Sequence, residues 1–104
     1  MKKKPVKVEP EADEELAAAV AWYDAQRSGL GAEFWAALRE ALDRVQSSPD
    51  AYALLDGVPA DFPARAASVH KFPYKIVYFD LPEVVHVLAF AHSKRAPLYW
   101  RDRG

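Results

Sequence analysis

The segment 70–100 constrains the possible folds more than any other part of the chain. Residues 74–79 (YKIVYF) and 84–91 (VVHVLAFA) are rich in β-branched and aromatic side chains, which favour strands. Between them, residues 80–83 (DLPE) supply turn chemistry, and Pro82 cannot donate a hydrogen bond inside a sheet. The second run is apolar on both faces of a strand, so both faces of the sheet must be covered. The segment therefore predicts a β-hairpin at the centre of the fold.

Two amphipathic helices are predicted upstream of this hairpin. Their apolar positions recur at helical spacing: Leu16, Val20 and Tyr23 in the first, and Phe34, Leu38, Leu42 and Val45 in the second. The first helix is expected over roughly 11–28, followed by Gly29 as a left-handed stop. The second is expected over 32–47 and ends before Pro49. Because the connection is short, the two helices should form an antiparallel hairpin.

Shorter strands and a connector complete the expected fold. Residues 5–9 alternate apolar and charged side chains, which predicts a short edge strand, and residues 64–72 alternate weakly as a further strand. Residues 50–63 contain one glycine and two prolines and are expected to be irregular. The order β-α-α-β-β-β predicts one α+β domain over 1–104, with an N-terminal antiparallel helical hairpin packed on an antiparallel β-sheet of three to four strands. The expected core comprises Phe34, Leu38, Leu42, Ile76, Tyr78, Val87 and Ala89.

Composition limits the classes of function. The 104 residues suffice for one domain, and 28% charged residues is ordinary for a globular protein. The absence of cysteine excludes disulfides, zinc–thiolate sites and a cysteine nucleophile. No apolar run approaches the roughly 18 residues of a membrane span, and no apolar stretch of a secretory signal follows the basic start, so we expect a cytoplasmic protein without membrane contact. Phosphate loops, metal-binding triplets and nucleophile elbows are missing, so no metal or other cofactor is expected.

Charge is distributed unevenly along the chain. Residues 1–63 contain 7 Lys and Arg against 12 Asp and Glu, a net charge of −5, whereas residues 64–104 contain 7 against 3, a net charge of +4. One interpretation is that the C-terminal half binds an anionic or acidic partner. The other is that the helical half and the sheet half neutralise each other. The sequence favours neither.

Two histidines of the predicted hairpin invite different interpretations. His86 lies within a strand and is expected to be a partly buried, hydrogen-bonded residue rather than a ligand. His92 ends a strand just before Lys94 and Arg95, where side chains converge on a shared cleft. There it would suit a general base or a phosphate donor. A strand-end histidine that is bonded to the backbone is an equally good interpretation.

Basic and aromatic residues are interleaved in the C-terminal part of the chain. The set comprises Arg65, Lys71, Lys75, Lys94, Arg95, Arg101 and Arg103 with Tyr99 and Trp100. Cations that neutralise phosphates and rings that stack on bases suit single-stranded nucleic acid. The same set would bind an acidic peptide equally well. Arg65 and Arg95 would also suit a structural role, paired with acids of the helical half.

Three segments, 22–52, 71–79 and 87–103, resemble the RelE/ParE superfamily of type II toxins, and the likeness covers roughly residues 8–103. Its specific motifs are the GLGxEF helix turn, the corner Phe72-Pro73-Tyr74, and the ending with His92, Arg95, Pro97 and Trp100 in register. The resemblance implies a helical hairpin against an antiparallel sheet. It also implies a cognate antitoxin whose C-terminal segment wraps the toxin, and hence a hetero-oligomer.

The resemblance leaves the mode of action open. In the ribosome-dependent nuclease branch two strand lysines are expected where this chain has Ala66 and Ser68, and an arginine where it has Lys75. Losing both lysines removes electrostatic stabilisation of the developing oxyanion. Replacing Arg by Lys also loses the two-pronged phosphate contact. A nuclease would then have to use Lys75, Arg95 and Tyr99, with Lys94 beside them, as its catalytic set.

Three functions therefore remain. The first, which we favour, is a ParE-like toxin that inhibits by binding DNA gyrase, the target that the family implies. Its target-binding residues would be Arg65, His92, Lys94, Arg95, Trp100 and Arg101. The second is a RelE-like mRNA endonuclease that acts on the ribosome. The third is an inactive family member that serves as a binding partner.

Overall fold

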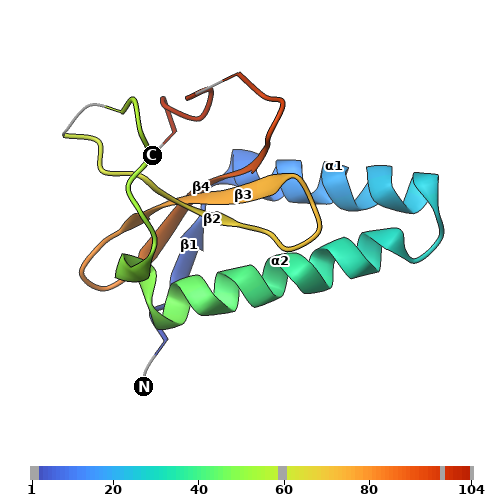
Figure 1. The fold of residues 1–104 in the computed structure, drawn as a ribbon, viewed down its shortest axis with the longest axis horizontal. Helices are drawn as coiled ribbons and strands as arrows, with labels where there is room; N and C mark the ends of the chain where they lie inside the picture. The colour runs from blue at the N-terminus through green and yellow to red at the C-terminus, as the bar shows by residue number, and fades with distance from the viewer. Residues whose placement is uncertain (1–2, 59–60, 97, 104) are drawn as a thin grey trace.

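The computed structural model describes residues 3–58, 61–96 and 98–103, and its elements follow the predicted order (Figure 1). They are β1 (Val6–Val8), α1 (Pro10–Gln26), α2 (Leu30–Ser47), the short 3-10 helix η1 (Pro49–Ala51), β2 (Arg65–Ser68), β3 (Tyr74–Asp80) and β4 (Val85–His92). Both helices begin one or two residues earlier than predicted. No helix within the described residues is long and apolar enough to cross a membrane. The prediction of an α+β fold built on a helical hairpin and a sheet is confirmed.

The sheet has the strand order β1-β4-β3-β2. The pairs β2–β3 and β3–β4 are antiparallel, as predicted. Strand β1 instead pairs with β4 in parallel, with Val6 opposite Val85 and Val8 opposite Val87. The sheet is therefore mixed, and the prediction of a wholly antiparallel sheet is wrong for this strand. A parallel pair needs a long crossover connection, and the two helices lie within the one between β1 and β4.

The strand predicted over 64–72 is shorter than expected. It ends at Ser68, because Lys71 adopts a left-handed backbone conformation with φ 70° and the chain turns there. The turn is closed by a hydrogen bond of 3.0 Å from the Val69 N–H to the Tyr74 carbonyl. Beyond it, the rings of Phe72 and Tyr74 pack on those of Tyr23 and Phe34. The aromatic corner thus anchors the start of β3 to both helices.

A β-bulge decides which side chains of β4 face the helices. Val77 lies opposite Ala89 and Tyr78 opposite Val87, so Leu88 is an extra residue on β4. An extra residue shifts the alternation of faces by one. Before the bulge Val87 packs into the core beneath the helices, and after it Phe90 does so. Without the bulge, Phe90 and His92 would point to the other side of the sheet.

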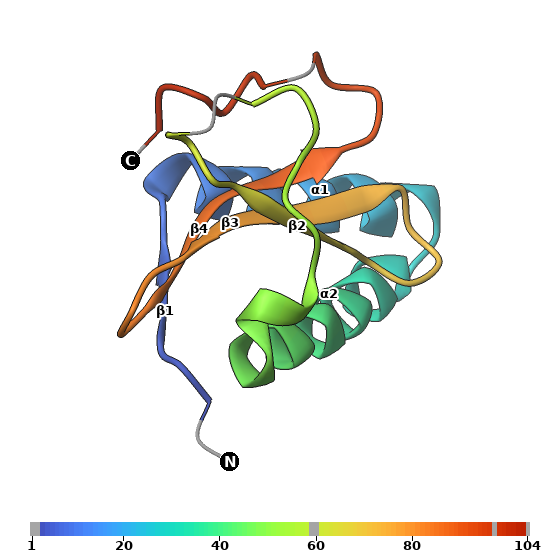
Figure 2. The same ribbon diagram turned by 60° about the vertical axis from the view of Figure 1, so that its left-hand side comes forward.

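The two faces of the sheet are covered by different parts of the chain (Figure 2). The helices cover one face, as predicted. The other face is covered by the connector, whose described residues are 52–58 and 61–62, and by the tail, the described residues 93–96 and 98–103 that follow β4. Trp100 of the tail and Phe62 of the connector close a second apolar cluster over Val77 and Leu88. The apolar run of β4 is thereby buried on both sides.

The predicted core is confirmed with one exception. Phe34, Leu38, Ile76, Tyr78, Val87 and Ala89 are all fully buried. Leu42 is only partly buried, which contradicts the prediction. The inward position is taken by its neighbour Ala41, together with Leu38 and Val45. Successive residues of a helix are rotated by about 100°, so Leu42, one residue after Ala41, lies at the edge of the buried stripe.

Two glycines shape the turn between the helices. Gly29 adopts φ 89°, a left-handed conformation that glycine reaches without strain, as predicted. Gly31 is buried against α1, and a Cβ there would lie 2.6 Å from the Val20 carbonyl oxygen. Its N–H donates to the Asp24 carboxylate at 2.7 Å. The close approach of α1 and α2 at this end therefore requires glycine at position 31.

Candidate functional site

The carboxylate of Glu15 ties α1 to the tail and to β4. Its side chain is only 14% exposed. It accepts a hydrogen bond from the Tyr99 hydroxyl and an ion-paired one of 2.9 Å from Arg103 Nη1. The backbone N–H of Phe90 also donates to it, at 3.2 Å. Charge-assisted hydrogen bonds of this kind are stronger than neutral ones, so Glu15 fixes where the tail lies.

Two arginines of the tail flank the ring of Tyr99 and are held differently. The guanidinium of Arg103 donates to Glu15 and to the Leu88 carbonyl, the latter at 3.1 Å, and its side chain is 14% exposed. Arg95 is 54% exposed, and its Nη1 lies 3.8 Å from Glu15 Oε2. Its guanidinium carbon lies 3.8 Å from the centroid of the Tyr99 ring, a cation–π contact. Arg103 is thus anchored, and Arg95 is the guanidinium that a ligand can reach.

The hydroxyl of Tyr99 donates its hydrogen bond to the carboxylate of Glu15. Burial raises the pKa of Tyr99 well above its usual range, and the hydrogen bond to Glu15 and its negative charge raise this pKa further. Arg95 and Arg103 act in the opposite direction without cancelling the effect. At neutral pH the hydroxyl is therefore protonated and donates to the carboxylate.

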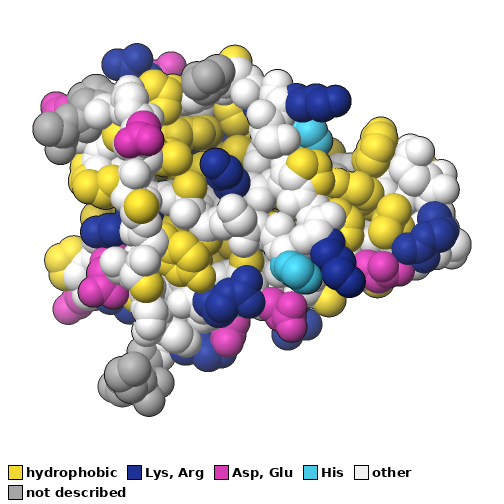
Figure 3. All heavy atoms as spheres, viewed as in Figure 1, with side chains coloured by type: hydrophobic (Ala, Val, Ile, Leu, Met, Phe, Trp, Pro, Cys, Tyr) yellow, Lys and Arg dark blue, Asp and Glu magenta, His cyan; other side chains and the backbone are white. Residues whose placement is uncertain are grey.

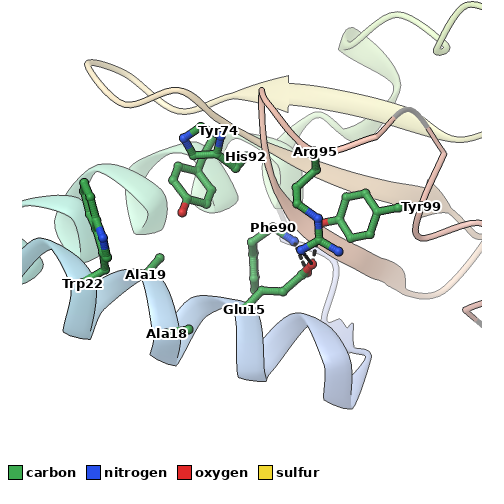
Figure 4. Close-up of a pocket in the computed structure, with 9 residues that line it drawn as sticks. All are labelled: Glu15, Ala18, Ala19, Trp22, Tyr74, Phe90, His92, Arg95 and Tyr99. Atoms are coloured by element: carbon green, nitrogen blue, oxygen red, sulfur yellow. Dashed lines mark hydrogen bonds and ion pairs between the residues drawn. The ribbon is translucent and has the colours of Figure 1, made fainter.

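A cleft of about 310 Å³ opens between α1, the end of β4 and the tail (Figure 4). It is lined by Glu15, Ala18, Ala19 and Trp22 of α1, by Tyr74, Phe90 and His92 of the sheet, and by Arg95 and Tyr99 of the tail. Apolar side chains and aromatic rings make most of its wall, with one carboxylate and one guanidinium at the tail end. Trp22 stands at its outer side and is 59% exposed.

A second cleft, of about 250 Å³, lies between the tail and the other face of the sheet. His92, Arg95 and Tyr99 line both clefts, and the second adds Lys75 and Trp100. The fold therefore brings together the sequence-predicted residues Lys75, His92, Arg95, Tyr99 and Trp100. They come from the start of β3, the end of β4 and the tail.

The position of His92 limits its chemistry. Its Nδ1 accepts the backbone N–H of Lys94 at 3.0 Å, and its ring meets the edge of Tyr74 with the centroids 5.0 Å apart. In a neutral imidazole, an accepting Nδ1 leaves the proton on Nε2. Neutral His92 therefore presents a donor toward a ligand. This matches the interpretation of a strand-end histidine that is bonded to the backbone.

Three other predicted residues lie outside this group, and Trp100 within it serves the fold. Arg65 is on β2, and its guanidinium donates to the Tyr52 carbonyl of the connector. Lys94 and Arg101 are exposed and line neither cleft. Trp100 is 4% exposed and stacks on Phe62 with the ring centroids 5.8 Å apart, so it covers the sheet. Pro97 of the family-like ending lies outside the described residues.

Glu15 is the site residue that sequence reasoning missed. The spacing of Glu15 nevertheless held a signal, because it comes three residues after Ala12 and four before Ala19, both of which are buried. A carboxylate on the buried stripe of a helix requires a donor or a cation. The partners, Tyr99 and Arg103, lie too far along the chain for spacing to find them.

His86 behaves as the sequence indicated. It is buried, and its Nε2 lies 2.6 Å from the Glu9 carboxylate at the start of α1. The pair joins β4 to the segment between β1 and α1. It stands apart from both clefts, so it contributes to the fold rather than to the site.

The molecular surface carries two further features. A shallow groove of about 480 Å³ runs along the helical hairpin and is lined mainly by Leu16, Ala17, Val20, Ala21 and Trp35. On the face seen in Figure 3, the Lys and Arg side chains are scattered among apolar ones and form no continuous basic stripe. Among residues 3–58, 61–96 and 98–103, no group of three or more His, Asp or Glu side chains could hold a metal ion.

A scan against models of protein families and a search of curated proteins both found no match for this chain. The resemblance to the RelE/ParE superfamily therefore rests on the motifs of the sequence alone.

Proposed function

We propose that this protein is the toxin of a type II toxin–antitoxin pair of the RelE/ParE kind. It acts in the cytoplasm, inhibits growth by binding its target, and is neutralised by a cognate antitoxin. DNA gyrase is the target that the ParE branch implies. The proposal rests on the motif resemblance and is supported by a helical hairpin that packs on a sheet, although β1 makes that sheet mixed rather than antiparallel.

The observation that favours binding over cleavage is the bond between Tyr99 and Glu15. A tyrosine that moves a proton in a nuclease needs a free hydroxyl with a pKa near the working pH. Here the hydroxyl donates to a carboxylate and its pKa is raised. Two of the cations that would stabilise a phosphorane, Arg95 and Arg103, share that carboxylate. The site is therefore poorly suited to in-line cleavage and well suited to binding.

One observation favours the second candidate, a ribosome-dependent mRNA endonuclease. Lys75, Arg95 and Tyr99, the set that such an enzyme would have to use, line one cleft together with His92. His92 Nδ1 already accepts the Lys94 N–H, and β2 carries no lysine, since Ala66 and Ser68 lie opposite Val77 and Lys75. The cleft has the residues of a nuclease site without its full complement of cations.

The groove on the helical hairpin supports the antitoxin part of the proposal. It is apolar, shallow and about 480 Å³ in volume, with Trp35 41% exposed beside it. An exposed apolar groove of this kind suits an amphipathic helix of a partner. The antitoxin of the pair should therefore lay an apolar helical face along Leu16, Val20 and Trp35.

Expression of the chain alone in bacteria from an inducible promoter tests the proposal. Growth should stop, plasmids should lose negative supercoiling, and the purified protein should inhibit supercoiling by purified gyrase. Substitution of Arg95 by Met should weaken inhibition in part, and the effect should depend on salt because an exposed charge carries the contact. Arg39→Met, which removes an exposed arginine from α2, serves as the control.

Two outcomes would contradict the proposal. Ribosome-dependent mRNA cleavage that is lost in Tyr99→Phe would establish the nuclease alternative. Unimpaired growth, with full expression of a folded protein, would establish the third possibility, an inactive binding partner. Primer extension on a reporter mRNA and topoisomer gels of a reporter plasmid distinguish these results in one culture.

A further inference from the structure

Glu15 occupies donors that would otherwise be available to an external anion. The Tyr99 hydroxyl, Arg103 Nη1 and the Phe90 N–H all point at its carboxylate, and Arg95 Nη1 lies 3.8 Å away. A phosphate would be bound by the same kinds of donor. The chain thus fills its own anion site with a carboxylate of α1, as Figure 4 shows for Glu15, Arg95 and Tyr99.

This carboxylate also lowers the positive charge of the cleft. Arg95 and Arg103 share the single negative charge of Glu15, which leaves a net charge of +1 on the three side chains. The side chains of Glu15 and Arg103 are each 14% exposed, so solvent and salt screen their interaction little. Lys94 and Arg101, both exposed, have no ion pair among the described residues.

We propose that Glu15 is a specificity-determining residue that prevents the tail from binding single-stranded nucleic acid. The inference rests on the proposed function, in which the tail serves a protein target. The cleft otherwise has the parts that a single strand needs, since Trp22 and Tyr74 offer rings for stacking and Arg95 offers a cation. Glu15 supplies the repulsive element: a phosphate placed against Arg95 would lie beside a buried carboxylate, and such like-charge contacts are costly.

The test measures binding of a fluorescently labelled oligodeoxythymidine by the full chain at several salt concentrations. Glu15→Gln keeps the shape of the side chain and removes its charge. It should bind the probe about threefold to fivefold more tightly at low salt, the gain expected from freeing one exposed cation. The slope of log affinity against log salt should steepen by about 0.7, the value for one additional phosphate contact on a single strand. Glu14→Gln removes the same charge from an exposed neighbouring position and should change neither quantity beyond experimental scatter.

Arginine variants locate the effect at the cleft. Arg95→Met should abolish the gain in the Glu15→Gln background. It should change the weak binding of the wild type by less than about twofold, because the Glu15 carboxylate beside Arg95 already repels a phosphate there. Arg101→Met, which removes an unmasked cation, should reduce wild-type binding more than Arg95→Met does. The comparison of Arg95→Met with Arg101→Met is made with Glu15 intact, so it does not depend on whether Glu15→Gln folds. The folding of Glu15→Gln is checked by near-ultraviolet circular dichroism.

The inference is overturned if folded Glu15→Gln binds the probe no better than Glu14→Gln. It is also overturned if Arg95→Met weakens wild-type binding as much as Arg101→Met does. If these variants do not behave as expected, the inference about Glu15 fails, but the results of the growth and gyrase assays that test the proposed function are not affected. Ribosome-dependent mRNA cleavage by the wild type would overturn the proposed function and this inference together.

Discussion

Tyr78 should make the stability of this protein fall steeply at alkaline pH. The ring lies fully buried on β3, and its hydroxyl donates a hydrogen bond of 2.6 Å to the Pro49 carbonyl of η1. Burial raises the pKa of Tyr78 from its ordinary value of 10.0 to about 12, and Arg65 only partly opposes this. Ionisation would place a charge in the core and remove the donor to Pro49. Neutral Tyr78 is therefore favoured in the folded state.

The sign and the size of the effect follow from this shift. The folded-state pKa lies above the unfolded-state pKa, so the stabilisation is fully present below pH 10 and is lost as the pH rises toward 12. Two pKa units correspond to about 3 kcal/mol in the free energy of unfolding, most of which should be lost by pH 12. At neutral pH, Tyr78→Phe should cost about 1–3 kcal/mol, because the Pro49 carbonyl is left without its donor.

Urea titrations followed by circular dichroism between pH 8 and pH 12 test this reasoning in the wild type and in Tyr78→Phe. The advantage of the wild type over the variant should shrink by about 2 kcal/mol between pH 10 and pH 12. Tyr23, Tyr74 and Tyr99 also have raised pKa values, and their contribution cancels in the comparison. If both proteins lose stability in parallel over this range, Tyr78 does not titrate as argued and the reasoning is refuted.

Three further changes test the packing of the helices and of the tail. Leu38→Ala should cost about 2–5 kcal/mol in a denaturant titration through lost burial and a cavity, whereas Leu42→Ala, at a partly exposed position, should cost clearly less; equal losses would contradict the assignment of the buried stripe. Gly31→Ala should cost about 1–3 kcal/mol, because its Cβ would lie 2.6 Å from the Val20 carbonyl oxygen, and an unchanged melting temperature would show that the helices move apart freely. Arg103→Met should speed tryptic cleavage after Arg95 several-fold by releasing the tail from Glu15, while Arg101→Met should leave that rate unchanged; identical rates would show that the ion pair does not hold the tail.

The opposite charges of the two halves of the chain are partly paired with each other. Arg95 and Arg103 of the basic half pair with Glu15 of the acidic half, and Lys4 of the acidic half pairs with Asp80 at 2.6 Å. These contacts support the interpretation that the halves neutralise each other. The tail cations available to a partner are Lys94 and Arg101, which are exposed and outside these pairs, and Arg95, which is 54% exposed.

Local patterns in the sequence were sufficient to predict the helices and strands and most of the core residues. The helices, the central hairpin and the left-handed Gly29 all follow from spacing, turn residues and backbone preferences, which act within a few residues. The same patterns placed Leu38, Ile76 and Tyr78 in the core, where they are buried. Such features are predictable because their physical causes are local.

Only the tertiary structure decided the arrangement of the site. Spacing along the chain does not show that β1 pairs with β4 in parallel, or that Leu88 forms a bulge that turns His92 toward α1. It also does not show that Glu15 meets Tyr99, 84 residues further along the chain. A buried carboxylate must find donors, but which donors reach it depends on how α1, β4 and the tail pack together. The sequence determined which side chains the protein has for its site, and long-range packing determined which of them are paired and which are free.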